Sequence, residues 1–207
     1  MLIYDKKLDS DYTFFGIPDV SKEKVLYFDI ETTGFLTGSS SIYLIGCAYY
    51  EDGNWKLRQW FAQTPDEESE ILSAFLAFAE PYSYLIHYNG NTFDLPFLRK
   101  KADKYGISYT LSSKKGLDIF RRITPYKNFL KLPDCKLKTI ESFLGIHRED
   151  IYTGGQLIQV YHDYTSSHDY DLYHTLILHN ADDMKGMLET LPILSYYDLF
   201  NCSIKAS

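Results

Sequence analysis

Short apolar runs separated by turn residues dominate the first half of the chain. The run over residues 25–30 is almost continuously apolar and rich in β-branched and aromatic side chains, which predicts a strand buried on both faces. A second strand is predicted over residues 41–50. The Asp-Gly pair within residues 51–54 predicts a tight turn, after which the alternating segment 55–62 returns as the other half of a hairpin. Residues 84–88 form another strand-like apolar run.

Apolar residues at helical spacing follow these strands. Residues 64–67, Thr-Pro-Asp-Glu, predict a capping box and a helix behind it that runs to residue 79. A second helix is expected over residues 95–105, and a further strand within residues 109–117. The remainder is predicted to be mostly helical, over residues 119–123, 137–144 and 172–197, with Pro192 able to break the last helix.

The order of these elements predicts the fold class. A strand, a hairpin and then alternating helices and strands indicate a mixed three-layer α/β domain, with a five-stranded sheet in which an antiparallel hairpin lies beside parallel strands. The domain is expected to span residues 25–200, and residues 1–24 are expected to form an N-terminal arm packed on it. A length of 207 residues with 45% hydrophobic residues suits a single packed core.

Cysteine usage and hydropathy bear on the compartment. Cys47, Cys135 and Cys202 are scattered and form no C-x-x-C pair, which argues against a disulfide framework or a zinc site and for a reducing, cytoplasmic location. No secretory signal is visible, and the nearly charge-free run over residues 71–79 is too short to cross a bilayer. We therefore expect no membrane partner.

Charge is unevenly distributed along the chain. The net charge is -7, yet residues 99–138 hold 12 Lys and Arg against 3 Asp and Glu. A basic block in an acidic chain is typical of a track for a polyanion such as nucleic acid. It is equally typical of a solvated basic helix face, so charge alone leaves both interpretations open.

Several acidic residues lie at positions where a carboxylate would be costly to bury without a positively charged partner. Asp29 and Glu31 end the first apolar strand, and side chains two residues apart on a strand point to the same face. Asp94 follows another strand in a similar way, although Asp near a helix start is also common capping chemistry. His179 and Asp183 are four residues apart on the last predicted helix, so their side chains lie on the same face. Such a pair can bind a metal, act as an acid and a base, or form an exposed ion pair.

Together these residues match the needs of two divalent cations. Hard oxygen ligands suit Mg²⁺ or Mn²⁺, and two such ions roughly 4 Å apart stabilise the attacking and leaving oxygens of an in-line phosphoryl displacement. The basic block would guide a phosphate backbone. The expected metal ligands are Asp29, Glu31, Asp94 and Asp183, with His179 beside them.

The motifs resemble those of the DEDD 3′→5′ exonuclease group within the ribonuclease H-like superfamily. Residues 29–34 (Asp-Ile-Glu-Thr-Thr-Gly) are similar to the first motif, and residues 89–96 to the second, which is seen also in proofreading domains of replicative polymerases. Residues 179–184 are similar to the third motif. The segment 144–155, followed by Tyr161, resembles the corresponding part of the YprB-like ribonuclease H-like domain family. The resemblance covers about residues 25–194, and the motifs are more specific jointly than singly.

The resemblance implies a metal-dependent exonuclease that releases nucleoside 5′-monophosphates from single-stranded 3′ ends. It implies that Asp29, Glu31 and Asp183 hold one cation and that Asp29 and Asp94 serve a second. His179 would take a proton from the attacking water. His179 stands four positions before Asp183, whereas members of the group with a His base usually have it five positions before the last Asp. Asp182 is the alternative final ligand, but its spacing of three places it off the metal-facing side of the helix.

Further residues are candidates for contacts with the substrate, through backbone N–H groups, aromatic stacking or pairing with phosphates. They are Thr32, Thr33, Gly34, Asn91, Phe93, Lys114, Lys115, Arg121 and Arg122. Asp118 is expected to cap a helix. Two other functions fit the same residues: an endonuclease of the superfamily that cuts hybrid duplexes or structured junctions, and a catalytically weak nucleic-acid-binding module. DNA and RNA fit the motifs equally well.

Overall fold

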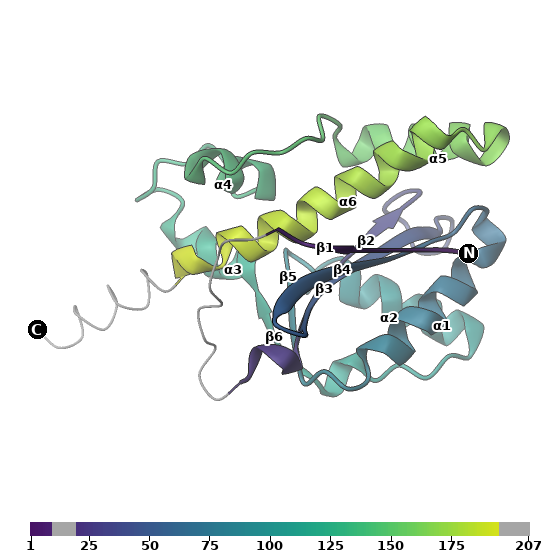
Figure 1. Cartoon of the computed structure of the whole chain (residues 1–207), viewed down its shortest axis with the longest axis horizontal. Helices are drawn as coiled ribbons and strands as arrows, with labels where there is room; N and C mark the ends of the chain where they lie inside the picture. The colour runs from purple at the N-terminus through teal and green to yellow at the C-terminus, as the bar shows by residue number, and fades with distance from the viewer. Residues whose placement is uncertain (10–19, 195–207) are drawn as a thin grey trace, which may run out of the picture.

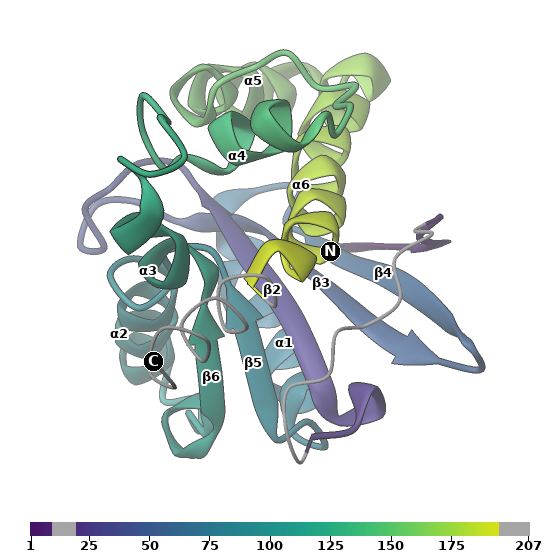
Figure 2. The same cartoon turned by 90° about the vertical axis from the view of Figure 1, so that its left-hand side faces the viewer.

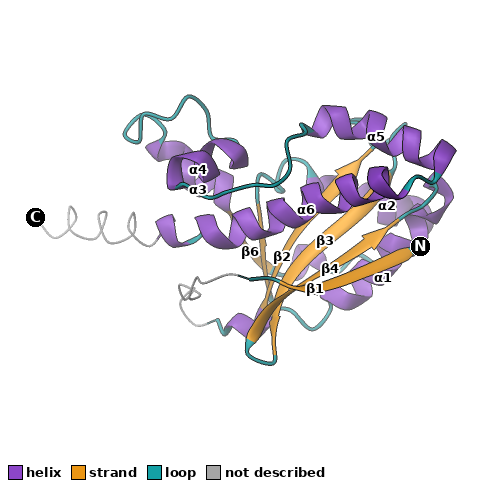
Figure 3. Cartoon of the chain, turned by 45° about the horizontal axis from the view of Figure 1, so that its top comes forward, coloured by secondary structure: helices purple, strands orange, loops and turns teal. Residues whose placement is uncertain are grey.

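The computed structural model describes residues 1–9 and 20–194. Within these residues a six-stranded sheet of order β1-β4-β3-β2-β5-β6 lies between two layers of helices (Figure 1 and Figure 2). The strands are β1 (Leu2–Lys7), β2 (Val25–Thr32), β3 (Ile42–Glu51), β4 (Asn54–Phe61), β5 (Tyr84–His87) and β6 (Lys115–Asp118). The α-helices, coloured purple in Figure 3, are α1 (Glu68–Ala79), α2 (Asp94–Tyr105), α3 (Ile119–Ile123), α4 (Leu137–Leu144), α5 (Gly154–Ser167) and α6 (Tyr170–Thr190).

The sheet is mixed, as the element order predicted. β2 pairs antiparallel with β3 and parallel with β5, β5 pairs parallel with β6, and β3 and β4 form the predicted hairpin. The carboxyl ends of β2, β5 and β6 therefore lie at the same edge of the sheet. Ligands of α/β sheets bind beyond this edge.

Alternation along β2 decides which helical layer each of its side chains meets. Leu26, Phe28 and Ile30 pack in the cluster formed with α1 and α2, whereas Val25 and Tyr27 pack in the cluster formed with α6. Since successive side chains on a strand point to opposite faces, Asp29 and Glu31 continue the row that faces α6. In Figure 1, α6 runs across one face of the sheet, and α1 and α2 cover the other.

The sheet has a sixth strand that was not predicted. β1 lies in the segment expected to be an arm, and it pairs antiparallel with β4 at the edge of the sheet, from Leu2 opposite Phe61 to Lys7 opposite Lys56. All six residues of β1 are exposed, so the segment lacks the alternation of buried and exposed positions that reveals a strand in a sequence. The middle of the predicted arm (residues 10–19) and the end of the predicted domain (residues 195–200) lie outside the described residues.

One helix was not predicted, and one local prediction about a helix start was wrong. The helix α5 was not predicted; it begins with two glycines, and Thr153 and Gln156 form the capping box at its start. The capping box predicted at Thr64 does not form, because Oε2 of Glu67 instead accepts a hydrogen bond of 2.7 Å from the backbone N–H of Gln63. The helix α6 ends before Pro192, and none of the described helices is long and apolar enough to cross a membrane.

Candidate metal centre

Four acidic side chains from three parts of the chain meet at the carboxyl edge of the sheet. Asp29 and Glu31 end β2, Asp94 is the first residue of α2, and Asp183 lies on α6. Oδ1 of Asp94 accepts a hydrogen bond of 3.1 Å from the backbone N–H of Ile30, which holds Asp94 beside the end of β2. The charges of Asp94, Glu31 and Asp183 all act on Asp29. The structure thus brings the predicted carboxylates together, and their role as metal ligands stays a prediction.

Gly46 lets α6 approach the sheet closely enough to complete this cluster. Gly46 is paired with Asp29 across β2 and β3, and a Cβ on it would lie 1.8 Å from Oδ1 of Asn180. The fully buried Asn180 donates from Nδ2 to Oδ2 of Asp29 at 3.1 Å and accepts a hydrogen bond of 2.9 Å from Gln59. Because Gly46 has no side chain, the helix α6, which carries His179 and Asp183, can lie close to β3.

Burial and mutual repulsion make the cluster a strong candidate for a cation site. Burial raises the pKa of Asp29 well above its ordinary value, and Asp94, Glu31 and Asp183 raise it further. Burial raises the pKa of Glu31 to about 7 and that of Asp94 to about 7, with Asp183 adding to both. Carboxylates held together in this way are costly unless a positive charge compensates them. A donor set of carboxylate oxygens and one imidazole fits Mg²⁺ or Mn²⁺.

His179 lies inside the cluster with each ring nitrogen in a different environment. Nδ1 is 2.7 Å from Oδ2 of Asp150, and Nε2 is 3.7 Å from Oε1 of Glu31 and 3.5 Å from Oδ2 of Asp183. Burial alone lowers the pKa of His179, but Glu31, the hydrogen bond with Asp150, and Asp183 outweigh it and raise the pKa to about 9. In the protein without a cation, the imidazole therefore carries a proton that balances part of the negative charge.

Arg148 is a second cationic group in contact with the cluster. Its Nη1 lies 2.6 Å from Oδ1 of Asp183 and 2.9 Å from Oε1 of Glu141, and its Nη2 lies 3.4 Å from Oδ2 of Asp150. Lys138 adds a contact of 2.8 Å to Asp150. Sequence reasoning assigned no role to Arg148 or Asp150, although both belong to the segment 144–155 that carried part of the resemblance, which is the only signal that could have found them.

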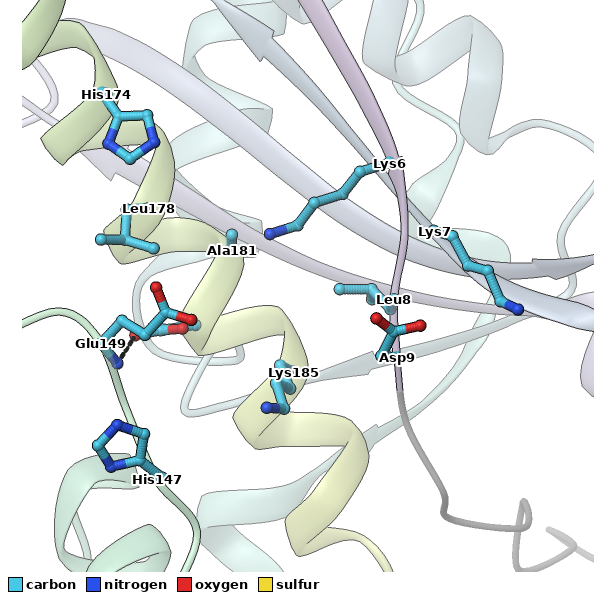
Figure 4. A pocket seen from close by; sticks show the side chains of 11 residues that line it. Lys6, Lys7, Leu8, Asp9, His147, Glu149, His174, Leu178, Ala181 and Lys185 are labelled. Carbon is cyan, nitrogen blue, oxygen red and sulfur yellow. Dashed lines mark hydrogen bonds between the residues drawn. The ribbon is translucent and has the colours of Figure 1, made fainter.

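Asp182 faces away from the cluster, so the structure brings Asp183 and not Asp182 to the other carboxylates. Oδ2 of Asp182 accepts hydrogen bonds of 2.8 Å from the backbone N–H groups of Glu149 and Asp150. Asp182 lines a separate open pocket of about 320 Å³ between α6, the end of β1 and the loop that follows α4 (Figure 4). Acidic and basic side chains both line this pocket, among them Glu149, Lys6 and Lys185.

The candidate substrate-binding residues Thr32, Thr33 and Gly34 lie at the end of β2 and in the loop that follows it. Oγ1 of Thr32 donates to the carbonyl of Gly34 at 2.8 Å, and Oγ1 of Thr33 accepts a hydrogen bond of 2.9 Å from the backbone N–H of Ser41. Both hydroxyl groups therefore shape the loop, and so does the backbone N–H of Thr33, which donates to the carbonyl of Ser41 at 2.9 Å.

Aromatic rings lie beside the cluster on this loop and at the start of α2. The ring of Phe93 is partly buried and lies 6.1 Å, centroid to centroid, from the ring of Phe35, which is 79% exposed. Asn91 is exposed, and its backbone N–H is 3.4 Å from Oδ2 of Asp118. Sequence reasoning missed Phe35, since an aromatic residue between two predicted strands gives no sign of its exposure.

The four basic residues that are candidates for phosphate contacts lie at opposite ends of the strands. Arg121 and Arg122 are exposed on α3, directly after the carboxyl end of β6 and hence at the edge of the carboxylates, where Asp118 caps α3 as expected. Lys115 starts β6 in register with Tyr84, at the opposite edge. Nζ of Lys114 donates to the carbonyls of Glu80 at 2.9 Å and Tyr82 at 2.7 Å. The positions of Lys114 and Lys115 thus do not favour direct contact with a terminal phosphate.

A mixed sheet between helical layers, with acidic residues gathered beyond its carboxyl edge, defines a ribonuclease H-like domain. The chain belongs to the RNase H superfamily, whose family model matches residues 26–192. This confirms the resemblance to the ribonuclease H-like superfamily.

Similar proteins include archaeal DNA polymerases. The chain is 31% identical over 158 residues to a DNA polymerase of Thermococcus hydrothermalis, covering 62% of this chain and 9% of the relative. It is 24% identical over 174 residues to a DNA polymerase of Archaeoglobus fulgidus, covering 73% of this chain and 19% of the relative. The family B DNA polymerase of Pyrobaculum calidifontis has a similar fold, with a TM-score of 0.63 and 18% identity over 79% of this chain and 23% of that chain. The chain thus spans less than a quarter of these proteins.

Proposed function

We propose that the protein is a metal-dependent 3′→5′ exonuclease that hydrolyses single-stranded nucleic acid to nucleoside 5′-monophosphates. The observation that carries the proposal is the convergence of Asp29, Glu31, Asp94 and Asp183 beyond the carboxyl ends of the strands. Membership of the RNase H superfamily and the likeness to family B DNA polymerases support a nuclease.

Asp29, Glu31 and Asp183 would hold one divalent cation, Mg²⁺ or Mn²⁺, and Asp29 and Asp94 would hold a second. Bound cations of this kind lower the pKa of water and stabilise the charge on a leaving oxygen. Asn180 orients Asp29 through the hydrogen bond of 3.1 Å, and Arg148 orients Asp183 through the contact of 2.6 Å. The resemblance implies that His179 accepts a proton from the attacking water. Its Nε2 also faces Glu31 and Asp183, so binding to a cation is a second role open to the same atom.

The surroundings of the cluster suit an unpaired strand end. The backbone of the loop at Gly34 would hold the terminal nucleotide, and Phe93 and Phe35 offer rings on which an unpaired base can stack. Arg121 and Arg122, exposed at the same edge of the sheet, would contact phosphates further along the strand.

A ladder assay tests the proposal. Single-stranded DNA and RNA, each labelled at the 5′ end, are incubated with the protein in Mn²⁺ or in EDTA. The expected result is a Mn²⁺-dependent ladder that shortens from the 3′ end, with nucleoside 5′-monophosphates as the products. Circular strands and strands with a blocked 3′ end should not be degraded. Cleavage of the circular strand would instead indicate an endonuclease, and binding without cleavage would indicate a binding module.

Paired variants connect the activity with the cluster. Asp29→Ala is expected to abolish Mn²⁺-dependent cleavage while circular dichroism remains that of the folded protein. Asp171→Asn is the matched control, because Asp171 is exposed in the first turn of α6, about 18 Å along the helix from Asp183. Full activity of Asp29→Ala would refute the proposed site.

A further inference from the structure

The two ring nitrogens of His179 differ in whether they have a hydrogen-bond partner. Nδ1 is within hydrogen-bonding distance of Asp150, whereas Nε2 has no hydrogen-bond partner in the part of the chain that the structure describes. Nε2 lies 3.7 Å from Oε1 of Glu31 and 3.5 Å from Oδ2 of Asp183. The side chain of His179 is only 6% exposed, so this nitrogen lies among the carboxylates in a mostly buried position.

Asp150 is held in a form that can only accept a hydrogen bond from the ring. Its Oδ2 lies 2.8 Å from Nζ of Lys138 and 3.4 Å from Nη2 of Arg148, and its Oδ1 accepts from the backbone N–H of Tyr152 at 2.9 Å. A carboxylate with two cationic partners has no proton to donate, so Nδ1 of His179 is the donor. In the neutral ring this leaves the lone pair of Nε2 directed at Glu31 and Asp183.

The distances around Nε2 fit a cation shared with both carboxylates. With bonds of about 2.0–2.2 Å, two ligand atoms of one ion lie at most about 4.4 Å apart. Both distances from Nε2 are shorter than this. A histidine that binds a metal also usually donates its other N–H to a carboxylate, as His179 does to Asp150.

We infer that Nε2 of His179 is a direct ligand of the cation held by Glu31 and Asp183, and that Asp150 is the positioning residue that fixes its tautomer. The inference deepens the proposed function, on which it rests for the identity of the site. An imidazole ligand favours Mn²⁺ and other first-row transition ions over Mg²⁺, which prefers oxygen. The centre should therefore bind Mn²⁺ more tightly than Mg²⁺. A bound Nε2 has no lone pair for a proton, so His179 does not take the proton of the attacking water.

Electron paramagnetic resonance on the full chain without nucleic acid tests the inference. Titration of Mn²⁺ gives its affinity, competition gives that of Mg²⁺, and electron spin echo modulation detects ¹⁴N bound directly to Mn²⁺. The wild type should show ¹⁴N coupling. His179→Gln should lose the coupling and bind Mn²⁺ at least about 10-fold more weakly, because losing a ligand costs no less than losing its outer-shell partner. The effect on Mg²⁺ should be smaller. His174→Gln, an exposed histidine on the same helix, is the matched control and should change neither.

A second variant tests the positioning role. Asp150→Asn should weaken Mn²⁺ binding by about 10–100-fold through the lost orientation of the ring, with a reduced ¹⁴N coupling. Circular dichroism of both variants reports whether they fold. If Asp150→Asn does not fold, the ¹⁴N coupling in the wild type still tests whether His179 binds the cation.

The outcomes separate this inference from the proposed nuclease. Mn²⁺ that binds to the wild type without ¹⁴N coupling, or with unchanged affinity in His179→Gln, overturns the inference, as does a wild type that binds no Mn²⁺. Nitrogen-bound Mn²⁺ in a protein that cleaves neither DNA nor RNA supports the inference and refutes the nuclease. Cleavage without ¹⁴N coupling supports the nuclease and overturns the inference.

Discussion

Glu68 and Lys101 form a buried ion pair that anchors the loop following β2. Oε1 of Glu68 lies 3.0 Å from Nζ of Lys101, and the two side chains are 0% and 3% exposed. Oε1 of Glu68 also accepts a hydrogen bond of 2.7 Å from the backbone N–H of Ile42, and Lys101 donates to the carbonyl of Ser40. A contact between α1 and α2 thus fixes the end of the loop that carries Phe35 and follows the candidate metal-site strand β2.

Replacing Lys101 should be costly. Lys101→Met leaves the carboxylate of Glu68 buried without its closest cation, so the free energy of unfolding should fall by about 3–5 kcal/mol. Lys104 is the matched control: its Nζ lies 3.7 Å from Oε2 of Glu68, but its side chain is 57% exposed, so Lys104→Met should cost less than about 1 kcal/mol. Urea unfolding measures both, and equal losses would contradict the role given to the buried pair.

Gly46 lies on β3, opposite Asp29 on β2, and adding one methyl group to it should disturb the candidate metal centre. In Gly46→Ala the new Cβ would lie 1.8 Å from Oδ1 of Asn180, so Asn180 must leave its hydrogen bond with Asp29. We expect a loss of about 1–3 kcal/mol in the free energy of unfolding and weaker Mn²⁺ binding. Gly38→Ala is the control, since nothing lies within 4 Å of its added Cβ. Wild-type Mn²⁺ affinity in Gly46→Ala would show that Asn180 does not hold Asp29.

Local chemistry explains which parts of the site could be predicted from the sequence. Asp29 and Glu31 share a face because a strand repeats every two residues, and His179 and Asp183 share one because a helix repeats every 3.6 residues. The apolar run that precedes Asp29 identified β2 and hence its carboxyl end. These relationships depend only on the spacing of residues within one element, so the sequence contains them.

Contacts between distant segments could not be predicted in this way. Asp150 meets His179 across 29 residues of sequence, and Arg148 meets Asp183 only because the loop after α4 returns to α6. No periodicity connects these positions. The strand β1 was missed for a different reason: its exposed residues gain their structure from backbone pairing with β4, which leaves no hydrophobic pattern.

Acid should destabilise the protein partly through His87. The imidazole is buried, and its Nδ1 accepts a hydrogen bond of 3.1 Å from the backbone N–H of Gly90, so the ring is neutral. Burial lowers the pKa of His87 from its ordinary value of 6.5; Asp118 acts against this shift, and Arg121 acts with it. The unfolded chain therefore takes up a proton at a higher pH than the folded protein. This part of the stability is complete above about pH 6.5 and is lost as the pH falls below it.

The variant His87→Asn isolates this effect, because the oxygen of Asn can accept the same N–H but does not titrate. Urea unfolding at pH 7 and pH 5 should show a loss of stability on acidification that is larger in the wild type than in the variant, by up to about 1.4 kcal/mol per pH unit. Parallel losses in the two proteins would mean that His87 is not responsible.

Phe35 should strengthen the binding of an unpaired strand without contributing to the fold. Its ring is 79% exposed and lies beside Phe93, so Phe35→Ala removes a stacking surface but almost no buried contact. In an Asp29→Ala background, which leaves the strand uncut, we expect fluorescence anisotropy at fixed salt to show single-stranded DNA binding weakened by about 1–3 kcal/mol. The free energy of unfolding should change by less than about 0.5 kcal/mol. Tyr170→Ala is the control, because Tyr170 is similarly exposed but starts α6, about 13 Å along the helix from His179. If Phe35→Ala binds the strand as tightly as its parent, the bases do not stack on this loop.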